Sequence, residues 1–300
     1  MAKTPTTPEP QESLLGENTV ISVTVPLADH KSTYEKVVAS YAGKVTVPGF
    51  RKGKAPKDLV EQSLNREKLI EEVLQQLLPP LYAEKITELS LSPLVTPQMN
   101  PKNTPVDGDW EVELYTAVAP EVKLGNWKEV VKKAQEEHLK SHTHEKKADE
   151  QGEEQKPPTK EEEEQHALSA VFGELIKSIK PKIAPVLLEN EVRRQITEFF
   201  QHLDSHKISP EVYMKRAGKT IQDIEQDYTF QALTSLQLEF ILQELSKEID
   251  PQPTAEEIEK LLGEKAKTLS TEAKTRLETE AKNVLIRQKT VEELKKIAKI

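Results

Sequence analysis

The sequence predicts an α+β N-terminal module that a charged segment joins to an elongated all-α C-terminal module, so that the chain is mainly α-helical. Three observations predict this arrangement. β-branched residues gather in short runs in the first part of the chain. Lysines and acidic residues then fill the stretch 132–165, with hardly any large apolar side chain. Beyond it, apolar residues recur every three or four positions to the end of the chain.

The composition limits the class of protein. A chain of 300 residues has room for about two domains of roughly 100–200 residues. Cysteine is absent, which excludes disulfides and thiolate metal sites and suits a reducing compartment. The sequence contains neither an apolar run long enough for a membrane span nor a signal core at its N-terminus. We therefore expect a cytoplasmic protein, and the formal charge of -9 argues against general nucleic-acid binding.

The N-terminal module starts after a proline-rich tail at 1–17, whose composition predicts disorder. A β-branched run at 20–25 predicts a strand that ends at Pro26. A helix is expected over 29–42, with Asp29 as its N-cap. Its predicted apolar face carries two tyrosines and two valines, namely Tyr34, Val37, Val38 and Tyr41.

Three further elements complete this module, which we expect to cover residues 18–131. A short helix is predicted around 59–64, and an amphipathic stripe continues over 70–86. Pro79 and Pro80 interrupt this stripe, so a kink or break is expected there. A second strand is predicted over 110–118, after a turn at Asp107 and Gly108.

Between these elements lies the loop 47–56, which reads V-P-G-F-R-K-G-K-A-P. Its prolines and glycines predict a rigid exposed loop, and no acidic residue occurs from Lys44 to Lys57. Phe50 stands among these cations as an apolar anchor, a pattern typical of docking on a negatively charged partner. A phosphate-binding loop is a poor fit, because Gly49 and Gly53 are one residue too close and Ala55 follows Lys54. The other alternative is a solvated basic loop with Phe50 folded back onto its own domain.

The charged stretch 132–165 is expected to be a flexible linker, although helical pieces within it stay open. Its histidines at 138, 142 and 144 have a spacing that would suit a transition metal on a helix, but nothing completes such a site. We therefore expect a polar spacer and no metal.

The C-terminal module, residues 166–300, carries several helix-boundary signals. A stripe from Leu188 to Leu203 predicts one helix. Ser209 followed by proline predicts the start of the next helix, which Gly218 ends. Thr220 is the predicted cap of a long helix that ends at Asp250, and the pair of Thr254 and Glu257 matches a capping box. A last helix is expected from about residue 271.

The loop also resembles the G-F-R-x-G-K-x-P signature of the trigger factor family, the bacterial ribosome-associated chaperones. The matching residues are Gly49, Phe50, Arg51, Lys52, Gly53, Lys54 and Pro56. Looser resemblances occur at 119–127, 185–192 and 213–220. The resemblance implies that the loop docks on the large ribosomal subunit beside the exit tunnel, and that nascent and unfolded chains are the clients. It leaves open a homodimer away from the ribosome.

One part of the family pattern is missing. Trigger factors ordinarily carry an FKBP-like peptidyl-prolyl isomerase domain between these regions, and a charged segment of about 34 residues cannot replace a domain of roughly 100. No other catalytic motif occurs. We therefore expect a non-enzyme without a cofactor.

The leading hypothesis is an ATP-independent chaperone that holds clients on apolar surfaces of its helical module. Candidate client-binding residues are Phe199, Leu236, Phe240 and Leu245, although packing between helices is the leading interpretation for each of the last three taken singly. The alternative is a non-catalytic adaptor that binds one defined partner.

Overall fold

The computed structural model describes residues 14–42, 48–51, 54, 56–145, 159–263 and 271–300. These residues form two compact units. The first, which we call the sheet unit, comprises Glu17–Ala119 and Ala184–Asn190. The second, which we call the helical unit, comprises Pro120–Ile183, Glu191–Ile300 and the described residues before Glu17.

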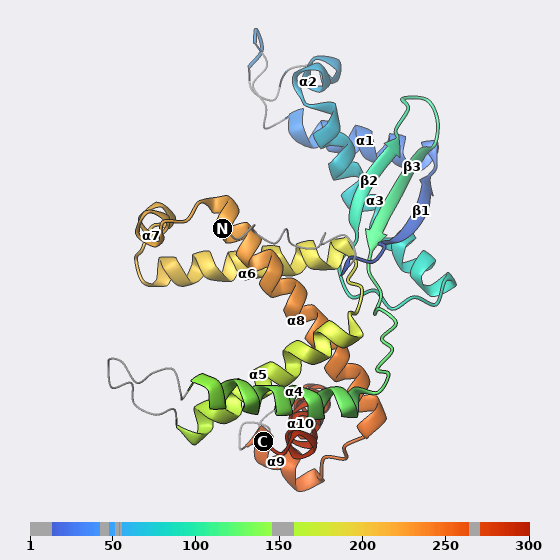
Figure 1. Ribbon diagram of the computed structural model, residues 1–300. Helices are drawn as coiled ribbons and strands as arrows, with labels where there is room; N and C mark the ends of the chain where they lie inside the picture. Colours follow the sequence, from blue (N-terminus) through green and yellow to red (C-terminus); the bar gives the residue numbers. More distant parts are fainter. Residues whose placement is uncertain (1–13, 43–47, 52–53, 55, 146–158, 264–270) are drawn as a thin grey trace, which may run out of the picture. The chain divides into compact units, whose positions relative to one another are not determined.

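The sheet unit combines a three-stranded antiparallel sheet with three helices (Figure 1). In chain order its elements are β1 (Thr19–Val25), α1 (Leu27–Ala42), α2 (Lys57–Ser63), α3 (Arg66–Glu88), β2 (Gln98–Asn103) and β3 (Trp110–Thr116). The strand order is β1-β3-β2, with β3 in the centre. The register places Val23 of β1 opposite Val112 of β3.

Alternation along the strands defines the core of the sheet unit. Buried side chains occupy every second position of β1 and β3, and the residues between them face outward or are half-buried. The buried set packs against apolar residues of α1 and α3, such as Val38 and Leu74. The two helices therefore cover one face of the sheet.

Three details of the sheet unit differ from expectation. Helix α1 begins at Leu27 instead of Asp29, and the Leu27 N–H donates to Asp109 Oδ1 at 2.8 Å. Helix α3 runs uninterrupted through Pro79 and Pro80; both prolines are exposed, and buried leucines hold the preceding turns in the core. Strand β2 was not predicted, because its polar sequence with an internal proline lacks the usual strand residues.

The helical unit contains the remaining helices. These are α4 (Trp127–Glu145), α5 (Lys160–Ile179), α6 (Pro185–Ser205, whose first turns belong to the sheet unit), α7 (Pro210–Ala217), α8 (Ile221–Ile249), α9 (Ala255–Leu262) and α10 (Thr271–Ala298). Helix α4 packs on α5 and α10, while α8 packs on α5 and α10. Trp127, Ile241, Leu245 and Leu294 lie at the centre of the resulting core. The mainly helical fold predicted from the sequence is thus confirmed.

The predicted helix boundaries follow the capping chemistry closely. Ser209 Oγ accepts from the N–H of Val212 at 3.3 Å, and Gly218 ends α7 at a φ of 65°. Thr254 and Glu257 form the expected capping box at the start of α9. These helix ends are set by residues close to them in the sequence, so the sequence alone is sufficient to predict them.

The proposed linker 132–165 differs from a flexible spacer at both ends. Residues 132–145 continue α4, where Ala134 is buried in the core, and 160–165 begin α5. A capping box of Thr159 and Glu162 starts α5, and the adjacent glutamates favour the positive end of its dipole. Residues 146–158 lie outside the described part of the chain.

The predicted disordered tail also ends earlier than expected. The N–H of Gly16 donates to the carbonyl of Ile183 at 2.9 Å, and the N–H of Ile183 donates to the carbonyl of Leu14 at 3.2 Å. These bonds order the end of the segment against the residues that precede α6. Residues 1–13 lie outside the described part of the chain.

Candidate functional site

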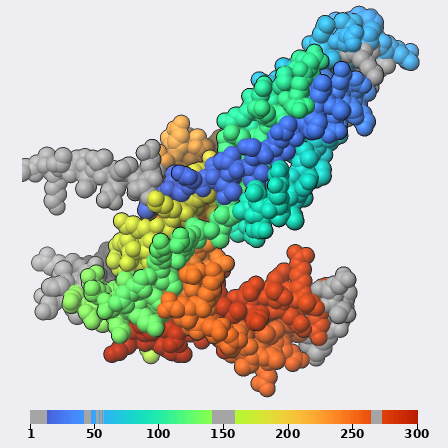
Figure 2. Space-filling view, turned by 90° about the vertical axis from the view of Figure 1, so that its right-hand side faces the viewer, coloured from blue at the N-terminus to red at the C-terminus, as the bar shows by residue number. Residues whose placement is uncertain are grey.

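The basic loop lies at one end of the sheet unit, between α1 and α2. Figure 2 shows the light-blue atoms of this region at the end of the unit, beyond the blue and green of β1, α1 and the other strands. Phe50 is 40% exposed, and Gly49 adopts a φ of 86°, which favours glycine. A turn closes where the N–H of Lys54 donates to the carbonyl of Arg51 at 2.9 Å.

The described loop residues of the predicted docking site are therefore accessible. Phe50, Arg51, Lys54 and Pro56 are all exposed. Lys52 and Gly53, which belong to the same prediction, lie outside the described residues. The arrangement offers an apolar side chain beside cations, which suits contact with phosphate groups or acidic side chains.

Helices on both sides hold the loop. Tyr34 Oη of α1 donates to Glu61 Oε1 of α2 at 2.9 Å, and Tyr41 Oη donates to Glu72 Oε1 of α3. Burial and the bond to Glu61 raise the pKa of Tyr34 to about 12. The bond to Glu72 likewise raises the pKa of Tyr41. Both hydroxyls thus keep their protons at neutral pH.

An aromatic cluster lies where α6, α7 and α8 meet in the helical unit. The ring of Phe199 is 5.0 Å from Tyr213 and 5.6 Å from Tyr228, measured between centroids. Exposed apolar side chains occur on the same stretch of α7 and α8: Val212 is 44%, Ile221 is 41% and Phe230 is 66% exposed. This set, which we call the aromatic corner, combines apolar area with aromatic edges.

The four predicted client-binding residues divide between surface and core. Phe199 and Leu236 are half-buried. Phe240 is 7% exposed, and Leu245 is fully buried in the core of the helical unit. These two residues are therefore core and are withdrawn as surface candidates. The sequence reasoning passed over Phe230, although its position outside the apolar stripe of α8 signals exposure.

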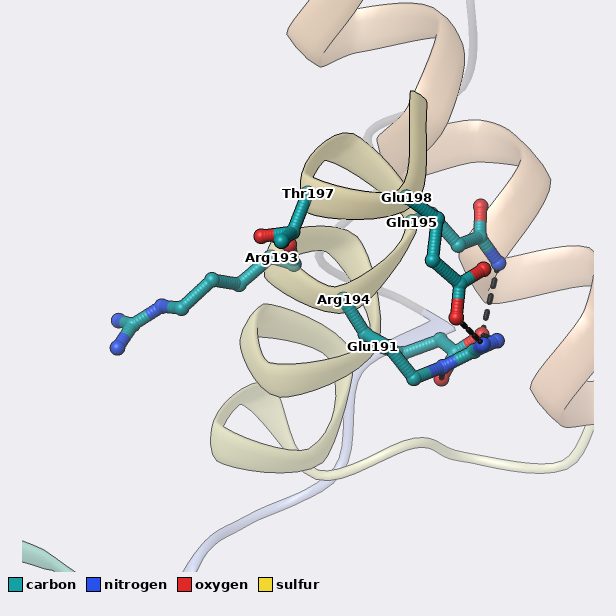
Figure 3. A network of polar contacts seen from close by, with 6 residues as sticks. All are labelled: Glu191, Arg193, Arg194, Gln195, Thr197 and Glu198. Atoms are coloured by element: carbon teal, nitrogen blue, oxygen red, sulfur yellow. Dashed lines mark hydrogen bonds and ion pairs between the residues drawn. The ribbon is translucent and has the colours of Figure 1, made fainter. Parts of the chain in front are cut away.

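The polar side of α6 is internally paired (Figure 3). Arg194 bonds to Glu191 at 2.5 Å and 2.9 Å and to Glu198 at 2.5 Å, and Gln195 Nε2 donates to Glu191 at 2.8 Å. The hydrogen bond from Arg194 lowers the pKa of Glu191. In Figure 3, Arg193 points away from this group. The network stabilises the helix turns that precede Phe199, each pair by about 0.2–0.5 kcal/mol.

A cavity of about 510 Å³ lies among α4, α8 and α10 in the helical unit. Several of its polar side chains are bonded: Trp127 Nε1 donates to Glu248 at 2.9 Å, and Lys296 pairs with Glu293 at 3.0 Å within α10. Lys289 pairs with Glu257 at 2.8 Å. The contacts of Trp127 and Lys289 join α4 to α8 and α10 to α9, which is a structural role.

The described ranges contain neither a three-residue metal site nor a membrane-spanning helix. No group of three or more His, Cys, Asp or Glu residues there could hold a metal ion. The side chains of His142 and His144, two of the linker histidines, are not among those described. None of the described helices is long and apolar enough to cross a bilayer.

Comparison with known proteins identifies the family. The model of the bacterial trigger factor protein matches residues 10–151, and the model of the bacterial trigger factor C-terminus matches residues 144–299. The chain belongs to the trigger factor family. The family's peptidyl-prolyl isomerase domain is not detected between the two matches. The two matches together account for residues 10–299.

Individual relatives match only part of their length. The trigger factor of Staphylococcus epidermidis is 34% identical over 124 residues, which is 41% of this chain and 29% of that protein. The trigger factor of Staphylococcus aureus strain JH9 is 32% identical over 124 residues, with the same coverage of both chains. The chain thus spans less than a third of these trigger factors. A solved structure, "Promiscuous Substrate Recognition in Folding and Assembly Activities of the Trigger Factor Chaperone", has a TM-score of 0.49 at 14% identity, covering 93% of this chain and 96% of that one.

Proposed function

We propose that this member of the trigger factor family is an ATP-independent chaperone that docks on the large ribosomal subunit near the exit tunnel and holds nascent or unfolded chains. The observation that carries the proposal is the basic loop. Its exposed Phe50 lies beside exposed Arg51 and Lys54 at the end of the sheet unit. The sequence around them contains no acidic residue from Lys44 to Lys57 in an otherwise acidic protein.

The proposed docking contact combines two kinds of energy. Cations of the loop meet phosphates or acidic side chains and release counterions, so the association weakens as salt rises. Phe50 fills an apolar notch in the partner and supplies a contribution that salt does not screen. A weak contact is sufficient, because docking needs only to raise the local concentration of chaperone near the emerging chain.

Clients would bind to the aromatic corner of the helical unit. Val212, Ile221 and Phe230 leave apolar area open to solvent on α7 and α8, the two helices whose tyrosines contact the half-buried Phe199. Dispersed apolar contacts of this kind accept many sequences, since no single pocket dictates the shape of the ligand. The proposed holding activity needs no nucleotide, because binding and release follow from the weakness of each contact.

The test for docking is co-sedimentation with bacterial ribosomes across a salt series. The wild-type chain is compared with F50A/R51A/K52A and with a matched control, K215A/R216A, which removes cations from α7 in the helical unit. The proposal predicts a salt-sensitive association that only the loop variant loses. Equal pelleting of all three proteins, or pelleting of none, would show that the loop does not mediate docking on the ribosome.

The test for holding uses several unrelated unfolded proteins diluted from denaturant. A chaperone suppresses their aggregation at near-stoichiometric amounts, and light scattering measures this suppression. Suppression of none of them would favour an adaptor that binds one defined partner.

A further inference from the structure

Two hydroxyl–carboxylate hydrogen bonds lie on either side of the basic loop. Tyr34 bonds to Glu61 at 2.9 Å, and Tyr41 bonds to Glu72. The two tyrosines are seven residues apart on α1, so they project from the same face two turns apart. Each bond therefore joins α1 to a different helix.

These helices are the stems from which the loop emerges. Helix α1 enters the loop at Ala42, and α2 leaves it at Lys57. The bond of Tyr41 holds the last turn of α1 against α3, and the bond of Tyr34 holds α2 against α1. Helix α2 has only seven residues, a length that is marginal without tertiary contacts. Its position depends on the buried Val60 and on contacts such as that from Tyr34.

We propose that Tyr34 and Tyr41 are positioning residues that fix the stems of the loop and thereby the direction in which Phe50 and Arg51 face a partner. The proposal rests on the docking function proposed above. The turn between Arg51 and Lys54 sets the local shape of the loop, and the helices α1 and α2 set where the chain enters and leaves it. A loop held in its bound direction binds more tightly, because less conformational freedom is lost on docking.

A purely structural role for the tyrosines is the alternative. Both rings are partly buried against the core of the sheet unit, and this packing would justify an aromatic residue without its hydroxyl. Substitution by phenylalanine separates the two roles, since it keeps the ring and removes the hydrogen bond. Tyr82 provides a matched control: its hydroxyl donates to Thr116 Oγ1 at 3.4 Å, between α3 and β3 rather than at the stems.

The test measures trypsin cleavage of the native full-length chain after Arg51 and Lys54, read by mass spectrometry. Loss of both hydroxyls should free the stems and raise the rate of loop cleavage about tenfold, the equivalent of about 1.4 kcal/mol in the opening equilibrium. Y34F and Y41F alone should have smaller effects, and Y82F should have none. The urea midpoint of Y34F/Y41F should remain close to that of Y82F.

Two results would overturn the proposal. One is unchanged loop cleavage in Y34F/Y41F, and the other is a rise in cleavage at all sites together with a lower urea midpoint. The second result would show that the hydroxyls stabilise the whole unit.

Ribosome co-sedimentation tests whether the orientation of the loop matters for docking. Y34F/Y41F should bind ribosomes more weakly than wild type at every salt concentration. The dependence of its affinity on salt should be unchanged, because its cations are intact. The triple loop variant should instead flatten the slope. If the wild-type chain does not bind ribosomes, the docking function fails, and the cleavage rates still decide whether the tyrosines position the loop.

Discussion

Two phenylalanines on helix α8, one buried and one exposed, allow the contribution of the core to stability to be distinguished from the contribution of the surface to client binding. Phe240 is 7% exposed and Phe230 is 66% exposed. Replacing a buried phenylalanine by alanine costs about 3–5 kcal/mol, through lost burial and the remaining cavity. Full burial of a phenylalanine side chain contributes about 1.5–3 kcal/mol to stability. Phe230 buries roughly a third of its surface, so F230A should lower the free energy of unfolding by only a third of that amount. The urea unfolding midpoint, followed by circular dichroism, should therefore fall sharply only in F240A.

Client holding should show the opposite order. Loss of a phenylalanine contact of about 1.4 kcal/mol weakens binding about tenfold, so F230A should suppress aggregation poorly while remaining folded. Because F240A risks unfolding, F240L serves as the core variant, at a cost below about 1.5 kcal/mol. F240L should hold clients as the wild type does. The reasoning is refuted if F240L loses holding with a normal midpoint, or if F230A holds clients normally.

Three further predictions concern capping, pH and catalysis. Asn18 Oδ1 accepts from the N–H of Val186 at 2.9 Å, so N18A should cost about 1 kcal/mol and speed hydrogen exchange in the first turn of α6; unchanged exchange there would contradict this. Contacts with Lys289 and Thr254 lower the pKa of Glu257. Its stabilisation is therefore complete above the ordinary pKa of the unfolded carboxyl and is lost as pH falls through the lower folded value. Stability of the wild type should accordingly fall more steeply than that of E257Q in acid, and parallel curves would count against the contacts. Finally, cis–trans exchange of a proline-containing peptide should proceed at its uncatalysed rate, since no isomerase domain is detected between the two family matches; a clear acceleration would refute this.

The sequence predicted those parts of the fold that depend on local chemistry. Ser209, Gly218, Thr220 and Thr254 all mark helix ends in the structure, because a side-chain cap or a positive φ acts within a few residues. The strand near residue 20 was predicted for a similar reason, since β-branched alternation is a local signal.

Elements that depend on distant partners were missed or misplaced. Strand β2 is held by pairing with β3 despite its internal proline. Helix α4 extends into the charged stretch because Val131 and Ala134 pack in the core of the helical unit. Because charged residues occupy most of the exposed positions of α4, its narrow buried stripe could not be recognised in the sequence.

The candidate site shows the same division. The signature residues around Phe50 could be identified from sequence, and the described ones are exposed. Periodicity also placed Tyr34 and Tyr41 on one face of α1, but it could not reveal that Glu61 and Glu72 receive their hydroxyls. Burial of Phe240 and exposure of Phe230 likewise depend on which helices cover α8, which periodicity within a single helix leaves undetermined.

The most direct test of the central claim is a photo-crosslink from the loop itself. A benzoyl-phenylalanine at position 50 is compared with one at Leu89, which is 51% exposed at the opposite end of α3, about 34 Å from its start at 1.5 Å per residue. Both proteins are irradiated with bacterial ribosomes at low salt. Docking through the loop predicts adducts with the large subunit from position 50 and few from position 89. Equal adducts from both positions, or none from position 50, would contradict it.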